Sequence, residues 1–151
     1  GLSNRLVDRL RQKEGLSYGV GSHVKLPQFG NRSSWMMSAI VAPQNLPKAE
    51  ACAKEEIARA VKDGFTEQEV KEAVKGILDS RAVNRAQDDY LAQSWLQFME
   101  AGKTFAFSKQ FEERIAAVTV DSVNAALRRM VVPENVTWIL SGDLAKAGLK
   151  K

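Results

Sequence analysis

The spacing of apolar residues changes along the chain, and the first change marks the end of a short helix. Leu2, Leu6 and Leu10 recur every four residues, a spacing that places them on one face of a helix. Gly15 follows them and is suited to end that helix. Over residues 17–26 apolar and polar residues alternate instead, which predicts a half-buried strand because successive side chains of a strand point to opposite faces.

The same alternation predicts how this strand is oriented. Its inner face would carry Tyr18, Val20, Val24 and Leu26, and its outer face Gly19, Gly21, His23 and Lys25. Pro27, Gly30, Asn31 and Arg32 predict a polar turn, and residues 33–42 read as a second strand, which Pro43 ends. We expect the two strands to pair as a hairpin.

From residue 45 onward the apolar spacing is helical. Asn45-Leu46-Pro47 predicts a helix start and Gly64 its end, and the capping box Thr66-Glu67-Gln68-Glu69 opens a second long helix that runs into residues 81–85. Further helices are expected after Asp88 or Asp89, with Leu91, Trp95, Phe98 and Met99 on the inner side, around Phe111 and Ile115, and from Thr119. Residues 136–140 read as a closing strand.

The order of these elements predicts the fold class. Strand and helix do not alternate regularly, which argues against a doubly wound parallel sheet. The pattern instead predicts an α+β fold, in which an antiparallel or mixed sheet has helices packed on one face. Neither an internal repeat nor a low-complexity linker is evident, so we expect a single domain over residues 1–151.

Composition narrows the classes of function. A hydrophobic content of 44% and a charged content of 26% are ordinary for a globular domain. The net charge of +4 is mild and its cations are mixed with acids, so no nucleic-acid partner is expected. The longest nearly apolar stretch, residues 35–43, is too short to span a bilayer. The single cysteine, Cys52, lies in a helical pattern among alanines and is predicted to be a small core residue.

The residues for catalysis within this chain are largely missing. A hydrolytic zinc site commonly needs about three protein ligands, and His23 is the single histidine. A Ser/His/Asp or Cys/His site would also need His23, and the Gly-x-Ser-x-Gly elbow is absent. Gly19-Val20-Gly21 lies inside the predicted strand and lacks the full dinucleotide fingerprint. We therefore predict no catalytic residue and no metal ligand in this chain.

Arg11 and Tyr18 are the candidate binding residues. Arg11 ends the first helix, Gly15 turns the chain and Tyr18 begins the strand, so the two side chains could converge near the edge of the sheet. A guanidinium and a phenol offer hydrogen-bond donors suited to a peptide carbonyl or to the oxyanion that develops when it is attacked. The alternative is structural, with Arg11 complementing the end of the helix and Tyr18 filling the core.

At these residues the chain resembles the pitrilysin/insulinase family of zinc metallopeptidases, the inverzincins. Ser3-Asn4-Arg5-Leu6 and then Leu10-Arg11-Gln12-Lys13-Glu14-Gly15-Leu16-Ser17-Tyr18 resemble its segment S-R-L … L-R-E-K-x-G-L-x-Y, with Asn4 as an interruption. The segments 64–70, 118–123 and 136–143 resemble its G-x-T-x-E-E-L, V-T-x-E-D-V and terminal V-x-x-G-D motifs in the same order. The combination covers nearly the whole chain.

The resemblance implies a specific role. Such peptidases are built from two similar α+β halves that close over an extended peptide, and the N-terminal half carries the zinc motif H-x-x-E-H. That motif is absent here, so the resemblance implies a non-catalytic C-terminal half that is inactive alone, with zinc on an N-terminal half in the same polypeptide or a separate subunit. By motif, the Arg and Tyr that contact the peptide substrate near the scissile carbonyl fall on Arg11 and Tyr18. The leading hypothesis is peptide binding by strand addition.

Several expectations rest on the resemblance or on the chain's first residues. A non-peptidase assembly subunit on the same fold is the alternative function. Bacterial relatives suggest the periplasm or cell envelope, with the cytoplasm as the alternative. The start at Gly1, without methionine and directly in a helix-like segment, suggests an N-terminally truncated domain of a longer protein. An unprotected sheet edge would then be available for homo-oligomer formation.

Overall fold

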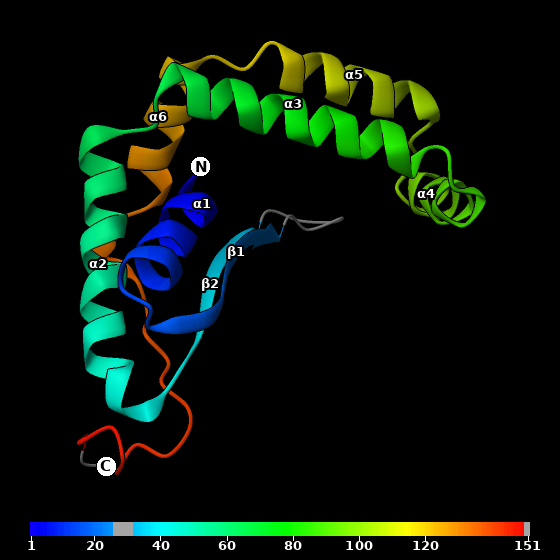
Figure 1. Ribbon diagram of the computed structural model, residues 1–151. Helices are drawn as coiled ribbons and strands as arrows, with labels where there is room; N and C mark the ends of the chain where they lie inside the picture. Colours follow the sequence, from blue (N-terminus) through cyan, green and yellow to red (C-terminus); the bar gives the residue numbers. More distant parts are fainter. Residues whose placement is uncertain (26–31, 150–151) are drawn as a thin grey trace. The chain divides into compact units, whose positions relative to one another are not determined.

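The computed structural model describes residues 1–25 and 32–149, and these divide into two compact units (Figure 1). Of the described residues, unit 1 comprises residues 1–25, 32–64 and 124–149, and unit 2 comprises Phe65–Val123. Leu26 of the predicted strand and the predicted turn residues Pro27, Gly30 and Asn31 lie outside the described residues. The expectation of a single domain stays a prediction, and each unit is described by itself below.

Unit 1 begins with a helix that widens toward its end. α1 (Leu2–Val7) continues directly into a π-helix, η1 (Asp8–Lys13). Leu6 and Leu10 are completely buried, as their spacing predicts. After η1 the chain turns at Gly15, which has φ of +61°, and the amide of Leu16 donates to the carbonyl of Leu10 at 2.8 Å. Glycine suits this position because side chains with a Cβ rarely adopt positive φ.

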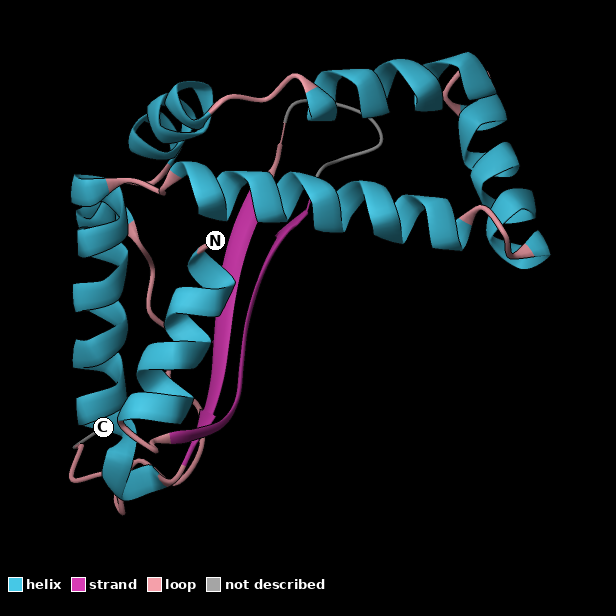
Figure 2. Ribbon diagram, turned by 45° about the horizontal axis from the view of Figure 1, so that its top comes forward, coloured by secondary structure: helices cyan, strands magenta, loops and turns pink. Residues whose placement is uncertain are grey.

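A two-stranded antiparallel hairpin follows the turn and confirms the predicted pairing. β1 (Ser17–Lys25) and β2 (Ser34–Val41) lie side by side (Figure 2), with Val20 opposite Ala39. Among the described residues these two strands form the sheet, and α1 and α2 both lie on one side of it (Figures 1 and 2). The predicted α+β class, with helices on one face of an antiparallel sheet, is therefore confirmed.

The third layer of unit 1 is the long helix α2 (Leu46–Asp63), entered through a short 3-10 turn, η2 (Pro43–Asn45). Its buried stripe contains Ala49, Cys52, Ala53, Ile57 and Ala60. Ala49, Cys52 and Ala53 of this stripe meet three leucines of the N-terminal segment, Leu6, Leu10 and Leu16, in one apolar cluster. α1 and η1 contact both α2 and the hairpin and are enclosed between them. The buried position of Cys52 confirms it as a core residue.

The predicted end of α2 is also confirmed. Gly64 has φ of +75°, and a Cβ placed there would lie 2.8 Å from side-chain atoms of Asn124. The carbonyl of Gly64 accepts a hydrogen bond of 2.9 Å from Arg5. Gly64 is thus required both for its backbone conformation and for the space that Asn124 occupies.

The C-terminal part of the chain differs from the prediction in one element. α6 (Val120–Met130) begins as expected after Thr119, whose hydroxyl accepts from the amide of Ser122 at 3.2 Å. A short 3-10 turn, η3 (Pro133–Asn135), follows. The closing strand expected at residues 136–140 is wrong, because this segment forms no strand. Its alternate side chains are half-buried and Trp138 packs on the core of unit 1, so burial alone accounts for the alternation without a paired neighbour.

Unit 2 contains three successive helices, α3 (Glu67–Asn84), α4 (Asp88–Glu100) and α5 (Phe105–Ala116). The predicted capping box of α3 is confirmed, since Thr66 and Glu69 bond to each other's backbone amides. The expected caps of α4 are wrong: Gln87 precedes the helix, and Asp88 and Asp89 lie in its first turn. α5 is longer than the short helix expected around Phe111.

The inner side assigned to α4 is also partly wrong. Leu91 and Phe98 are half-buried as expected, but Trp95 and Met99 are exposed by 51% and 62%. These two residues stay more than half exposed, although the ring of Trp95 also packs against Phe105 of α5. None of the helices in the described parts of the chain is long and apolar enough to cross a membrane.

Candidate functional site

The candidate site lies in unit 1, where η1 turns into β1. Arg11 lies in the last turn of η1 and its side chain is exposed. Its neighbour Leu10 is completely buried and anchors this turn against α2. A π-turn, in which backbone hydrogen bonds span five residues, is rare and often found at functional sites. The geometry therefore holds the backbone of Arg11 firmly while its guanidinium stays accessible.

Tyr18 is presented to solvent by a β-bulge. Ser17 pairs with Val41 and Gly19 with Ile40, so Tyr18 is an extra residue in β1. The buried hydroxyl of Ser17 donates toward the carbonyl oxygens of Ile40, at 2.7 Å, and Gly19, at 2.9 Å, and stabilises this irregular pairing. Tyr18 is consequently 87% exposed.

The exposure of Tyr18 corrects the predicted orientation of the strand. Tyr18 does not share the inner face with Val20, because the bulge shifts the alternation by one residue. It also rules out the structural alternative in which Tyr18 fills the core. Val24 faces Trp35 in the register but is itself exposed. The convergence of Arg11 and Tyr18 on one spot stays a prediction.

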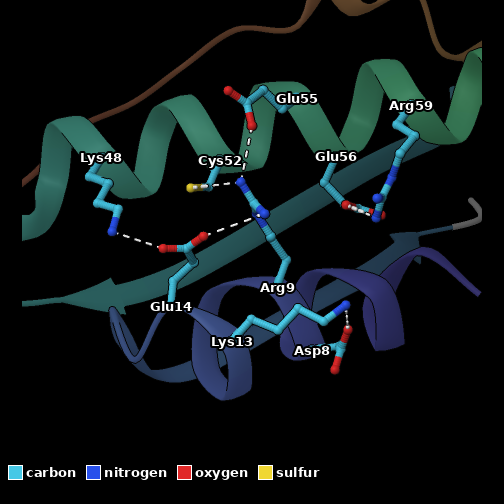
Figure 3. Close-up of polar contacts among 9 residues, drawn as sticks. All are labelled: Asp8, Arg9, Lys13, Glu14, Lys48, Cys52, Glu55, Glu56 and Arg59. Atoms are coloured by element: carbon cyan, nitrogen blue, oxygen red, sulfur yellow. Dashed lines mark hydrogen bonds and ion pairs between the residues drawn. The ribbon is translucent and has the colours of Figure 1, made fainter.

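A chain of charged groups connects η1 and α2 (Figure 3). Glu14 accepts from Lys48, with 2.8 Å between Nζ and Oε2, and lies 3.4 Å from Arg9. Arg9 also reaches Glu55, with 3.2 Å between Nη2 and Oε2, and Cys52, whose sulfur lies 3.7 Å from the same nitrogen. Arg9 precedes Arg11 in sequence and Glu14 follows it, so contacts to α2 are made on both sides of Arg11.

This arrangement places a cation beside Cys52 and lowers the pKa of Glu14. Cys52 is buried as predicted, but the Arg9 guanidinium lies against its sulfur. The hydrogen bond from Lys48 and its positive charge, with a smaller contribution from Arg9, lower the pKa of Glu14. The same hydrogen bond raises the pKa of Lys48. Glu14 is therefore held as a carboxylate just before the Gly15 turn.

Next to Glu55 on α2, Glu56 has a buried carboxylate that pairs with Arg59 of the same helix (Figure 3). Its Oε2 accepts from Arg59, while Oε1 is buried without a hydrogen-bond partner among the described residues. The sequence pattern does not predict this burial, because Glu56 lies in a run of charged residues, Lys54-Glu55-Glu56. The Glu56 carboxylate thus adds a polar group to the buried side of α2.

The described residues do not fit a zinc site. His23 is exposed on β1, opposite Met36, and it is the single histidine of the chain. Within residues 1–25 and 32–149, no three His, Cys, Asp or Glu side chains gather in a way that could hold a metal ion. The accessible groups at the η1 to β1 turn can instead donate hydrogen bonds to a ligand, as a guanidinium and a phenol do.

Comparison with known proteins agrees with this picture. Residues 1–77 match the family described as the peptidase M16 inactive domain, and this segment contains α1, η1, the hairpin, α2 and the first part of α3. The chain belongs to this family, which confirms the resemblance to a non-catalytic half of pitrilysin/insulinase-type peptidases. No curated protein matches the sequence.

Solved structures share the fold. The peptidase M16 inactive domain from Pseudomonas fluorescens is 22% identical, with a TM-score of 0.70 over 88% of this chain. The periplasmic protease PqqL from Escherichia coli is 20% identical, with a TM-score of 0.66 over 85% of this chain. This chain spans 31% of the first structure and 14% of the second.

Proposed function

We propose that this chain is the substrate-holding part of a zinc-dependent M16 peptidase and that Arg11 and Tyr18 contact the peptide substrate. The observation that carries the proposal is the exposed Tyr18 side chain, which the bulge at Ser17 presents instead of burying. A tyrosine that served only the core would be covered by apolar neighbours. Its exposure, together with that of Arg11, leaves two hydrogen-bond donors accessible beside one turn.

The hairpin supports binding of the peptide as an added strand. Among the described residues β1 and β2 pair only with each other, so each has one side free of strand partners. Backbone groups on such a side can pair with an extended peptide, and neighbouring side chains then supply specificity. In this role Arg11 and Tyr18 would donate to the carbonyl oxygen of the bound peptide and orient it.

The chemistry of peptide cleavage is proposed to belong to another half of the protein. The residues that the structure describes do not fit zinc, so no step of hydrolysis is assigned to them. The partner half would lie in the same polypeptide or in a separate subunit. The likeness to a protease described as periplasmic supports the periplasm as the compartment. An H-x-x-E-H motif in the partner half would favour this function over that of an assembly subunit.

Two substitutions test the binding role in the complete peptidase. Arg11→Ala and Tyr18→Phe each remove donors from the proposed carbonyl contact, so turnover of a peptide substrate should fall by about tenfold or more while zinc content stays unchanged. Peptide hydrolysis and metal analysis on the same preparations provide the two measurements.

Two matched variants control for the loss of a charge or a hydroxyl elsewhere. Lys13→Ala removes another exposed cation of η1, and Tyr90→Phe removes the hydroxyl of the other tyrosine, which lies in α4. Both should keep normal turnover. If Arg11→Ala and Tyr18→Phe also keep normal turnover, the binding role is wrong.

A further inference from the structure

α4 of unit 2 carries an apolar stripe whose large side chains are more than half exposed. Ala92, Trp95, Leu96 and Met99 follow the spacing i, i+3, i+4, i+7, which places them on one face of the helix. Trp95, Leu96 and Met99 are all more than half exposed. The packing of α4 inside unit 2 uses a different face, on which Leu91 and Phe98 are half-buried.

Trp95 has a defined position within this stripe. Its ring centroid lies 5.1 Å from that of Phe105, and Phe105 in turn meets Phe98 edge-on at 5.6 Å. The half-exposed indole of Trp95 therefore packs on one side against the ring of Phe105, which is itself held by Phe98. A large aromatic side chain that is held in place and exposed loses little conformational entropy on binding and is a frequent anchor of protein interfaces.

The charged residues of α4 itself all have one sign. α4 contains Asp88, Asp89 and Glu100 and no Lys or Arg. At 100° per residue, Asp88 falls between Trp95 and Met99, whereas Asp89 and Glu100 fall about 20° and about 40° beyond Leu96, along one edge of the stripe. Nearby cations of unit 2 are placed elsewhere, since Lys103 and Arg114 lie over the ring of Phe107. This α4 face is thus apolar and acidic.

The apolar and acidic character of this α4 face favours some binding partners over others. A second copy docked through a two-fold axis would bring the same acids against each other, because such an interface uses the same patch twice. An anionic membrane surface would repel them, and helices that lie on membranes usually have Lys and Arg on the polar face. Nucleic acid is excluded by the same sign of charge.

We propose that the α4 face formed by Ala92, Trp95, Leu96, Met99 and the flanking acids is a docking surface for a polypeptide segment with apolar residues flanked by Lys or Arg. Trp95 and Leu96 provide the apolar contact. Asp89 and Glu100 select the basic flanks. This surface belongs to unit 2 and is independent of the peptide contact proposed for Arg11 and Tyr18.

Two synthetic amphipathic helical peptides test the surface directly on the whole chain. They share the same apolar positions and differ only in having Lys or Glu at the flanking positions. The readout is the indole signal of Trp95 in a proton–nitrogen NMR spectrum, identified by its loss in Trp95→Phe. The Lys peptide should shift this signal and bind about tenfold more tightly than the Glu peptide, with the difference shrinking at high salt.

Variants separate the apolar and the charged contributions. Leu96→Ser should weaken binding of the Lys peptide by about tenfold, and Met99→Gln serves as a second variant. Both side chains are exposed, so their replacement leaves the helix folded. Asp89→Asn combined with Glu100→Lys should reverse the preference between the peptides. Glu100→Lys suits the helix dipole, because it places a cation near the C-terminus, and Asp88 keeps an acid in the first turn when Asp89 is replaced. Glu113→Lys on α5 is the control and should keep the original preference.

Three results would overturn the proposal. The first is equal binding of the two peptides, or no shift of the Trp95 signal with the Lys peptide. The second is a Trp95 indole in the free monomer that is shielded from a soluble quencher. The third is concentration-dependent self-association that Leu96→Ser abolishes, which would make a second copy the occupant.

Discussion

The two units of this chain bury their apolar side chains to very different degrees. Unit 1 encloses Leu6 and Leu10 completely between the hairpin and α2, and Ile57 of α2 is buried as well. In unit 2, Val70 is the single apolar side chain of α3, α4 and α5 that is counted as buried, and the aromatic rings of α4 and α5 are at best half-buried. Similar helical patterns in the sequence thus lead to a closed core in one unit and an open one in the other.

The difference shows what each unit depends on for stability. Burial of apolar area is the main source of stability where a core is closed. Unit 2 has less of it and relies more on ring contacts, a capping box and the ion pairs of Glu112 with Arg81 and Arg85. The comparison predicts that substitutions in unit 1 have larger effects than similar ones in unit 2.

The largest effect is expected for Leu10→Ala. Leu10 is completely buried, so its truncation leaves a cavity and should lower the free energy of unfolding by about 2–5 kcal/mol. Denaturant unfolding and hydrogen exchange of unit 1 amides measure the loss. Leu96→Ala is the matched control, because Leu96 is 58% exposed and its truncation should change stability by less than about 0.5 kcal/mol. Equal losses of unfolding free energy in Leu10→Ala and Leu96→Ala would contradict the predicted difference between the two units.

A smaller effect is expected for Phe98→Leu in unit 2. Phe98 meets Phe105 and Phe107 edge-on, with ring centroids at 5.6 Å and 6.0 Å. Two such ring pairs contribute about 0.5–1.5 kcal/mol each beyond their burial, and leucine keeps part of the apolar area. We expect faster hydrogen exchange in α4 and α5, corresponding to a loss of about 1–2 kcal/mol. A loss as large as that of Leu10→Ala would show that unit 2 has a closed core after all.

The next prediction compares two threonines that precede helices of unit 2. Thr66 caps α3 through its side chain, whereas Thr104 precedes α5 without a side-chain cap hydrogen bond. Thr66→Ala should therefore cost about 1 kcal/mol and Thr104→Ala clearly less. Amide exchange in the first turn of each helix is the measurement, and similar changes in both would contradict the assigned caps.

The smallest effect concerns acid sensitivity. The hydrogen bond from Arg81, together with the charges of Arg85 and Arg81, lowers the pKa of Glu112. A lowered folded-state pKa stabilises the protein above the unfolded value of about 4.3, and this contribution is lost as pH falls through the folded pKa. Glu112→Gln should therefore be less stable than the parent near neutral pH, and the two should converge in acid.

Urea unfolding at a series of pH values tests this convergence. Glu14→Gln is the counterpart in unit 1, because Lys48 lowers the pKa of Glu14 in the same direction. Loss of either carboxylate should remove acid sensitivity from its own unit. A difference between parent and variant that stays constant below about pH 4 would contradict the lowered pKa values.

Local structure was largely predictable from the sequence. The apolar spacing of Leu6 and Leu10, the capping box at Thr66 and the glycine that ends α2 were all confirmed. These signals are local, because a helix face, a cap and a positive φ each depend on a few neighbouring residues. The class of the fold followed from their order.

The exposed site and the open helix face were not predictable in the same way. The bulge that turns Tyr18 outward depends on how Ser17 meets Ile40 on the other strand. The stripe containing Trp95 reads as core in the sequence, since periodicity shows that a face is apolar but not what covers it.

By itself, the sequence determined the helices, the hairpin and the family motif around Arg11 and Tyr18. The tertiary structure decided the π-turn of η1, the bulge, the absence of a strand at residues 136–140 and the burial of Glu56. The physical reason is that each of these depends on contacts between segments distant in sequence. Local periodicity carries no information about which segment lies opposite, and that neighbour decides whether a side chain is buried or left to bind.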